Sequence, residues 1–253
     1  MREWIIGRNA VYESLRAGRR QAFRLLVAES AQEKGRLAEI ILFARKKKIP
    51  LETVPRQRLD SLVGGSQGGA GGHQGIALEA SGYPYCALAD ILQAASRFGD
   101  PPFIMILDTL QDPQNLGTLF RTCEAVGVHG VLLPLRHTAT VTPAVVNASS
   151  GASEHLLVTQ VNLAQAIITL KEANIWIVGL QGEPPAQDLD EVHLDGPLAL
   201  VVGNEGEGMR SLVRDSCDVL LRLPMRGQVA SLNAAVAGSI ALYFAWQARS
   251  FKK

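Results

Sequence analysis

The apolar positions of this chain form two patterns, and the change between them lies near residue 100. In the first part, apolar residues predict short strands that alternate with helices. Across residues 33–47, for example, Leu37, Ile40, Ile41 and Ala44 are spaced to lie on one face of a helix. The predicted elements of this part are helices at 9–17 and 33–47 and strands at 23–28, 50–54 and 76–80.

From residue 103 onward, continuous apolar runs alternate with helical patterns. Strands that are apolar throughout are buried on both faces, so they predict an α/β domain in which helices cover a parallel sheet. The predicted strands are 103–107, 130–133, 155–158, 175–180, 198–202 and 219–223, and the predicted helices are 116–126, 143–150, 163–173, 208–215 and 232–248. Ligands of such sheets bind beyond the carboxyl ends of the strands.

Two segments between the patterns predict where the domains divide. Residues 64–75 hold seven glycines in twelve positions, which predicts a mobile loop. Residues 81–102 contain a short helical pattern at 88–96 and end in Gly-Asp-Pro-Pro, which is typical of a linker. We therefore expect a small α/β domain at 1–80, a linker at 81–102 and a larger domain at 103–253.

The composition predicts a folded protein of the cytoplasm. Hydrophobic residues make up 47% of the 253 residues and charged residues 19%. We find neither an apolar stretch of membrane-spanning length nor the apolar region of a signal peptide. Cys86, Cys123 and Cys217 are scattered, so they predict buried thiols rather than disulfides or a metal site.

The net charge of +1 conceals an uneven distribution. Residues 1–80 hold 14 Lys and Arg against 8 Asp and Glu, whereas the remaining residues hold 11 against 16. The run Arg45–Lys48 suits a helix C-terminus, which is one explanation of the excess. The further cations Arg16, Arg19, Arg20, Arg56 and Arg58 favour a second explanation, contact with nucleic acid.

Three polar segments follow predicted strands. In the first, residues 107–127, either Asp112 or Asn115 is expected to cap the following helix. Arg121 lies about two turns beyond Asn115, within side-chain reach of the loop.

The second segment, LVVGNEGEGM at 200–209, carries the spacing G-x-x-G-x-G, the reverse of the dinucleotide fingerprint. It follows the fifth predicted strand of its domain, and Asp218 precedes a strand instead of ending one. Glu205 and Glu207 would also repel a pyrophosphate. These features argue against a phosphate cradle and against a nucleotide-dependent oxidoreductase.

In the third segment, residues 221–246, a strand runs into Pro224 and a short loop, and Ser231 is predicted to cap the last helix. The small residues Ala234, Ala235, Ala237, Gly238 and Ser239 would let this helix approach another backbone closely.

Together the three segments resemble the SpoU class of RNA ribose 2′-O-methyltransferases, in the knotted SPOUT superfamily. The matches are N-x-G-x-x-x-R from Asn115 to Arg121, the strand with G-N-E-G-x-G from Gly203 to Gly208, and L-P-M…S-L-N-A-x-x-A from Leu223 to Ala237. The opening I-x-G-R-N-A-V at residues 5–11 and H-Q-G-I-A at 73–77 resemble the ribosomal-protein-L30e-like domain of bacterial enzymes that methylate a guanosine ribose in 23S rRNA.

The resemblance implies a homodimer with a trefoil knot that binds S-adenosylmethionine, modifies RNA, with ribosomal RNA as the expected substrate, and needs no metal. By the same resemblance, the catalytic residues are Arg121, Asn115, Glu205, Ser231 and Asn233, and the cofactor-binding residues are Gly203, Asn204, Leu223, Met225 and Leu232. Because a guanidinium stays protonated in proteins, we expect Arg121 to bind a phosphate and stabilise the developing alkoxide rather than act as a base. Glu205 is expected to accept a hydrogen bond from a neighbouring loop, and Glu207 to lie on the surface.

Three alternatives to 23S rRNA guanosine methylation stay open. The first is 2′-O-methylation of another ribosomal nucleotide, such as the adenosine modified by the thiostrepton-resistance enzymes. The second is a transfer RNA nucleotide, although minimal transfer-RNA enzymes of the family generally lack the N-terminal domain. The third is a catalytically silent RNA-binding or assembly protein, which the retained Asn115, Arg121, Glu205, Ser231 and Asn233 disfavour.

Overall fold

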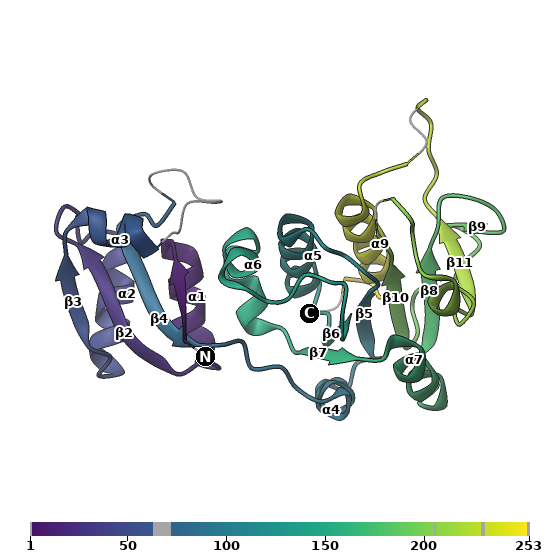
Figure 1. The fold of residues 1–253 in the computed structure, drawn as a ribbon. Helices are drawn as coiled ribbons and strands as arrows, with labels where there is room; N and C mark the ends of the chain where they lie inside the picture. Colours follow the sequence, from purple (N-terminus) through teal and green to yellow (C-terminus); the bar gives the residue numbers. More distant parts are fainter. Residues whose placement is uncertain (1, 63–71, 205, 229–230, 252–253) are drawn as a thin grey trace. The chain divides into compact units, whose positions relative to one another are not determined.

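The computed structural model describes residues 2–62, 72–204, 206–228 and 231–251, and its contacts divide the chain into two compact units (Figure 1). The N-terminal unit comprises Met1–Pro84 together with Thr140–His155. The C-terminal unit comprises Tyr85–Ala139 and Leu156–Lys253. A segment from the middle of the chain thus belongs to the N-terminal unit.

The N-terminal unit is a four-stranded sheet with helices. Its elements are β1 (Arg2–Ile6), α1 (Arg8–Ala17), β2 (Ala22–Ala28), α2 (Arg36–Lys46), β3 (Leu51–Val54), α3 (Arg56–Leu62), β4 (Ile76–Ser81), α6 (Pro143–Ala148) and the 3-10 helix η2 (Ala152–His155). The strand order is β1-β4-β2-β3, in which the β2–β3 pair is parallel and the other two pairs are antiparallel. The sequence pattern missed β1 and α3. In α3, Leu59 is the buried residue, so the helix has no apolar stripe to reveal it.

A buried ion pair ties the middle segment to the rest of the N-terminal unit. The Arg20 guanidinium donates to both carboxylate oxygens of Glu154, at 2.9 and 3.0 Å, and to Glu3 at 2.8 Å. The side chains of Arg20 and Glu154 are each 1% exposed. Beside this ion pair, the Tyr83 hydroxyl donates a hydrogen bond to the Ser153 carbonyl of the middle segment.

This arrangement corrects part of the expected nucleic-acid surface. Arg20 is buried in the pair just described, so its charge does not reach solvent. Arg19 donates to the Tyr83 hydroxyl and to the Pro84 carbonyl, and Arg16 pairs with Glu13. Arg56 and Arg58 are exposed, as expected.

The C-terminal unit is built on a seven-stranded sheet in which every strand pair is parallel, with the order β7-β6-β5-β10-β8-β11-β9. Its elements are α4 (Leu88–Phe98), β5 (Phe103–Leu107), α5 (Pro113–Ala125), β6 (Gly130–Pro134), β7 (Val158–Val161), α7 (Leu163–Glu172), β8 (Trp176–Leu180), β9 (Gln187–Asp188), β10 (Leu198–Val202), α8 (Ser211–Arg214), β11 (Val219–Arg222) and α9 (Ala234–Ala248). The predicted parallel sheet is confirmed.

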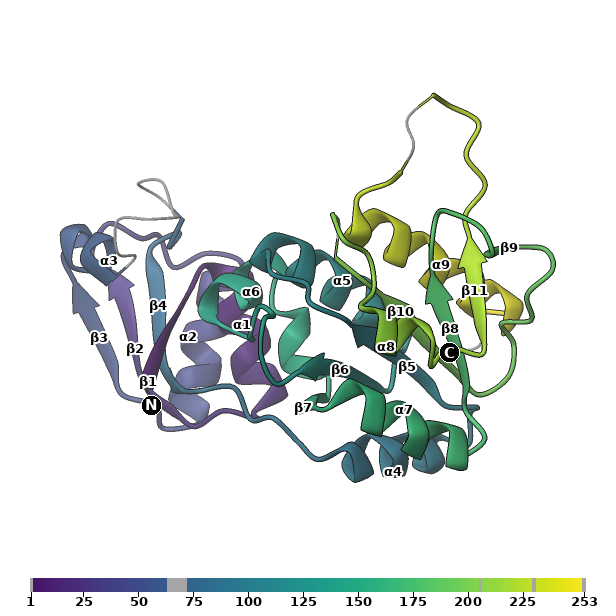
Figure 2. The same ribbon diagram turned by 45° about the vertical axis from the view of Figure 1, so that its right-hand side comes forward.

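Helices cover both faces of this sheet (Figure 2). Ile104 and Ile106 of β5 share a core with residues of α4, α7 and α8. Met105 lies between them in sequence and therefore faces the opposite side, where it lies near Gly238 of α9. Helices α5 and α9 pack against each other on that side.

The predicted elements differ from the structure in a few places. The strand expected at 155–158 is wrong, because residues 152–155 form η2 and β7 begins at Val158, where pairing with β6 starts. The short strand β9 was not predicted. Of the glycine-rich loop at 64–75, residues 64–71 lie outside the described part, and 72–75 form a turn before β4. The knot stays a prediction.

The three cysteines are free thiols. Burial raises the pKa of the Cys123 thiol far above its usual range, and burial, reinforced by the Asp218 carboxylate, raises the pKa of Cys217 to about 12. Both thiols are therefore unreactive. The prediction of buried thiols is confirmed for Cys123, whereas Cys86 and Cys217 are half-buried. In the described residues, no helix has the length and apolar character needed to cross a membrane, and no cluster of His, Cys, Asp and Glu is suited to a metal ion.

We expect Arg20→Met to lower the free energy of unfolding by about 3–5 kcal/mol, because it leaves the buried Glu154 carboxylate without its guanidinium partner. Urea denaturation measures the change. The control is Arg16→Met, which removes an exposed pair and should cost less than about 0.5 kcal/mol. Equal losses in the two variants would contradict a structural role for the buried pair.

Candidate active site

The carboxyl ends of β5 and β10 lie side by side, and a buried carboxylate joins the loops that leave them. Leu107 of β5 pairs with Val202 of β10, and the Asp108 amide donates to the Val202 carbonyl at 2.8 Å. The Asp108 side chain is fully buried. It accepts hydrogen bonds from the main-chain amide and the guanidinium of Arg210, at distances from 2.6 to 2.8 Å. The loop after β10 is thereby fixed at both ends.

That loop holds the glycine-rich motif and folds back on itself. The main chains of Asn204 and Gly208 bond to each other in both directions, each at 3.0 Å, and Gly208 has a left-handed φ of +70°. A Cβ on Gly203 would lie 2.2 Å from the Gly208 carbonyl carbon and 2.3 Å from the Met209 nitrogen. Glycine is therefore required at 203 for the chain to approach its own backbone. Glu205 lies outside the described residues.

Asp112 caps helix α5. Its carboxylate accepts from the Gln114 amide at 3.0 Å, and Pro113 occupies the first helical position. Of the two capping candidates, the structure selects Asp112. Asn115, in the first turn of the helix, makes a tertiary contact instead.

The partner of Asn115 in this contact is Asn233, which also caps helix α9. Its side-chain oxygen accepts from the amides of Ala235 and Val236, at 2.9 and 3.2 Å, while its amide nitrogen donates to Asn115 Oδ1 at 3.2 Å. The expectation that Ser231 caps this helix is wrong, because α9 begins at Ala234 and Ser231 lies exposed two residues before the cap. The structure thus joins two of the predicted catalytic residues.

Small residues let α5 and α9 pack closely, as the sequence predicted. A Cβ on Gly238 would lie 2.7 Å from a methyl carbon of Leu119 in α5 and 3.1 Å from one of Val202 in β10. Next to this contact, the hydroxyl of Thr122, one turn after Leu119 in α5, lies 2.9 Å from the hydroxyl of Ser239, which directly follows Gly238 in α9. The two helix N-termini are therefore held at the same edge of the sheet.

Arg121 lies exposed on α5. Asn115 and Thr122 are seven residues apart and share the face that meets α9, whereas Arg121 is turned about 100° from Thr122. Among the described residues, no hydrogen bond or ion pair holds the Arg121 side chain. Its charge is available to a ligand, and its catalytic role stays a prediction.

The residues predicted to bind the cofactor follow β10 and β11. Leu223 is half-buried directly after β11, and Asn204 is half-buried in the glycine-rich loop. Met225 and Leu232 are 43% and 37% exposed, which is unusual for large apolar side chains. Exposed apolar residues continue along α9 at Val236, Tyr243 and Phe244.

The sequence interpretation missed Asp108 and Arg210. The signal for Asp108 was present, because it is an acidic residue directly after the continuous apolar strand FIMIL, at the sheet edge where ligands bind. Arg210 carries no such signal. The contact between Arg210 and Asp108 joins residues that are 102 positions apart, and it depends on the path of the loop after β10.

Two family models match this chain. The model described as the SpoU rRNA Methylase family matches residues 102–243, and the model described as RNA 2′-O ribose methyltransferase substrate binding matches residues 4–86. A similar protein is the putative TrmH family tRNA/rRNA methyltransferase YacO of Bacillus subtilis. The two chains are 41% identical over 98% of this chain and 96% of that protein.

Solved structures with the same fold include the SpoU methyltransferase AviRb from Streptomyces viridochromogenes in complex with AdoMet. It has a TM-score of 0.79 and 22% identity over 99% of this chain and 92% of that one. An AdoMet-bound rRNA methyltransferase from Sinorhizobium meliloti has a TM-score of 0.77. Its sequence is 21% identical, and the match covers 97% of this chain and 87% of that one. A structure concerning methylation of C/U34 on tRNA covers 60% of this chain and 99% of its own, with a TM-score of 0.54 and 24% identity.

The edge of the sheet thus carries the loops of the SpoU motifs, and both family models match in order along the chain. The chain belongs to the SpoU rRNA methylase family and is an RNA 2′-O-ribose methyltransferase that uses S-adenosylmethionine.

Proposed function

We propose that this enzyme methylates the ribose 2′-hydroxyl of a guanosine in 23S ribosomal RNA, in the cytoplasm and as a homodimer. The observation that carries the proposal is the N-terminal unit, in which the two motifs of the guanosine-modifying subgroup meet. Arg8 from the opening motif donates its amide to Gln74 Oε1 at 2.9 Å and its Nε to the Gln74 carbonyl at 3.2 Å. The fold of the tRNA-related structure corresponds to only 60% of this chain.

The homodimer is supported by the apolar surface of α9. Val236, Tyr243 and Phe244 are 40–49% exposed, on a helix whose other face packs on α5 and β10. A surface of this kind favours a protein interface. In the proposed dimer, a second copy covers this surface and borders the site.

The residues after β10 and β11 fit S-adenosylmethionine. Apolar Leu223, Met225 and Leu232 suit the adenine ring, and the folded-back loop that begins at Gly203 offers main-chain groups. When bound, the cofactor would supply an electrophilic methyl group on a positively charged sulfur. The ribose 2′-oxygen would take the methyl group, the sulfur would keep the electron pair of the broken bond as a neutral thioether, and the 2′-hydroxyl proton would pass to water or a nearby acceptor. In this proposal Asn204 also contacts the cofactor, and Glu205 organises the loop through a hydrogen bond.

We assign Arg121 to the RNA side of the reaction. Its exposed guanidinium can bind a phosphate through two parallel hydrogen bonds and stabilise the negative charge that develops on the 2′-oxygen. Asn115 and Asn233 hold α5 and α9 at their N-termini, which fixes the helix that carries Arg121. Ser231 lies in the loop before that junction, where we propose a contact with the substrate.

The ribosomal target is tested by mapping 2′-O-methylated nucleotides in ribosomal and transfer RNA from cells with and without this gene. We expect one guanosine of 23S rRNA to lose its methyl group and to regain it when the gene is restored. A lost position in transfer RNA, or at an adenosine, would replace the proposed substrate. Unchanged methylation at every position would indicate a silent RNA-binding protein.

Arg121→Lys should lower kcat by about 100-fold and leave the Kd for S-adenosylmethionine unchanged, because a point charge cannot replace the planar guanidinium. Single-turnover transfer to RNA and calorimetry measure the two quantities. The matched control is Arg226→Lys, an exposed arginine in the loop after β11. Near-full transfer by Arg121→Lys would refute the assignment.

Gly203→Ala should weaken S-adenosylmethionine binding by at least about tenfold, because the added Cβ displaces the Gly208–Met209 backbone. Isothermal calorimetry gives the affinity, and circular dichroism shows whether the fold is retained. Gly206→Ala is the control, since a Cβ there meets no atom within 4 Å. If both variants bind the cofactor like the parent, the glycine-rich loop does not shape the cofactor site.

A further inference from the structure

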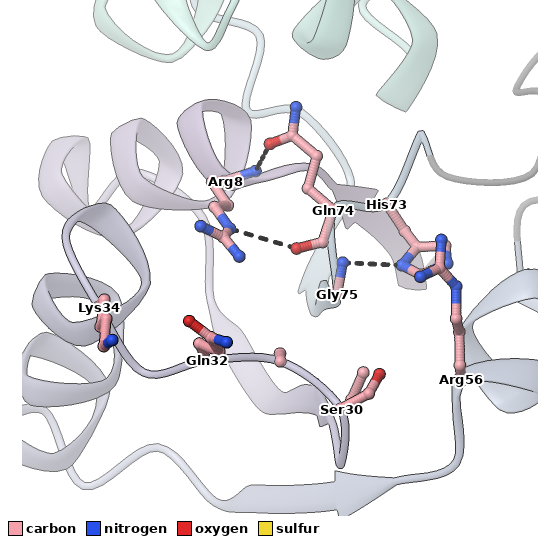
Figure 3. A pocket seen from close by; sticks show the side chains of 10 residues that line it. Arg8, Ser30, Gln32, Lys34, Arg56, His73, Gln74 and Gly75 are labelled. Atoms are coloured by element: carbon pink, nitrogen blue, oxygen red, sulfur yellow. Dashed lines mark hydrogen bonds between the residues drawn. The ribbon is translucent and has the colours of Figure 1, made fainter.

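The N-terminal unit contains a cavity of about 560 Å³ that is remote in sequence from the methyl-transfer motifs. Its volume lies in the range of about 300–1,000 Å³ typical of ligand sites. Figure 3 shows that the residues around it come from four separate segments: Arg8, residues 28–34, Arg56 and residues 73–75. The lining residues are Arg8, Ala28, Ser30, Ala31, Gln32, Lys34, Arg56, His73, Gln74 and Gly75.

One wall of the cavity is rigid. His73 is fully buried; its Nδ1 accepts from the Gly75 amide at 2.9 Å, and its Nε2 lies 3.0 Å from Asp60 Oδ1. Because Nδ1 accepts a hydrogen bond, the proton of the neutral ring is on Nε2 and is donated to Asp60. Residues 73–75 are thus fixed before any ligand arrives, and the two Arg8–Gln74 bonds join them to the start of α1.

The cavity concentrates positive charge. Arg8, Lys34 and Arg56 line it, and none of the described residues that line it carries a carboxylate. The side chains of Lys34 and Arg56 form no hydrogen bond or ion pair with described residues, and Arg8 uses its Nε alone. By contrast, Arg16, Arg20 and Arg24 of this unit each pair with a glutamate.

The remaining polar groups suit a nucleotide. Gln32 offers a side-chain amide with a donor and an acceptor, and Ser30 offers a hydroxyl. In Figure 3 the Gln32 amide faces the open centre of the cavity, between Arg8 and Ser30. Among the described lining residues, the apolar side chains are those of Ala28 and Ala31, which are too small to anchor a hydrophobic peptide.

We propose that this cavity binds an unpaired nucleotide of the RNA substrate, with Arg8, Lys34 and Arg56 at its phosphates and Gln32 and Ser30 at its base and sugar. The inference rests on the proposed function for the identity of the RNA. The cations supply affinity. Gln32 and Ser30 are exposed on a hollow that opens to solvent, so their polar groups can reach a base and a sugar that have left a helix, whereas a paired base does not enter a cavity of this size.

The test compares two double variants of the full chain that each remove two positive charges. Lys34→Gln with Arg56→Gln changes the cavity. Arg45→Gln with Lys46→Gln changes two exposed cations at the end of α2, which do not line it. Circular dichroism should give the same melting temperature for both and for the parent.

The probe is a fluorescein-labelled 20-nucleotide single-stranded RNA of mixed sequence, and anisotropy gives its Kd between 50 and 200 mM salt. We expect the cavity variant to bind about 10-fold to 100-fold more weakly, with a log Kd against log salt slope that is smaller by about 1.4. The control should change by less than about threefold. A labelled polyglutamate peptide of equal charge, run in parallel, should bind weakly to all three proteins.

Unchanged RNA affinity in the cavity variant overturns the inference, and so does an equal loss in the control, which would reveal a diffuse charge effect. Polyglutamate binding that matches RNA binding and depends on the same residues would also overturn it. The assay contains no cofactor. A failure of methyl transfer would therefore refute the proposed function while leaving the cavity result intact.

Discussion

A single buried carboxylate organises the active edge of the sheet. Asp108 has no contact with solvent, and three donors of Arg210 satisfy it. The Arg210 side chain is itself half exposed. The full free-energy cost of removing a charge from water therefore falls on the Asp108 carboxylate alone. Such a pair contributes little net stability, but it admits one loop geometry, because any other geometry leaves the carboxylate unpaired.

That constraint propagates through the glycine-rich loop. Arg210 is fixed to Asp108 at the end of β5, and the Asn204–Gly208 bridge reverses the chain between Gly203 and Arg210. Met209 then enters the core beside Gly179 of β8, where the missing side chain leaves room for it and for Cys217. The motif is thus shaped mainly by contacts with its own chain, and its exposed side remains available to a ligand.

The sequence predicts the sheet well because continuous apolar strands report burial directly, as in β5 and β10. It predicts helix starts less well. Asp112 and Asn115, and Ser231 and Asn233, are all competent caps, and local propensity cannot choose between them. The tertiary bond between Asn115 and Asn233 fixes the outcome, and it joins residues 118 positions apart. Likewise, nothing local in Arg20 distinguishes a core ion pair from an RNA contact, since its partner Glu154 is 134 residues away.

The position of Glu154 has a consequence for the order in which the protein is made. The N-terminal unit needs residues 140–155 to neutralise Arg20 and to contact α1 and β1. On the ribosome it therefore cannot complete its core when residue 84 emerges, and must wait until β5 and β6 of the other unit have also been synthesised. Because residues 140–155 follow β5 and β6 in the chain, no single cut separates the two units without leaving one partner of the buried Arg20–Glu154 pair behind.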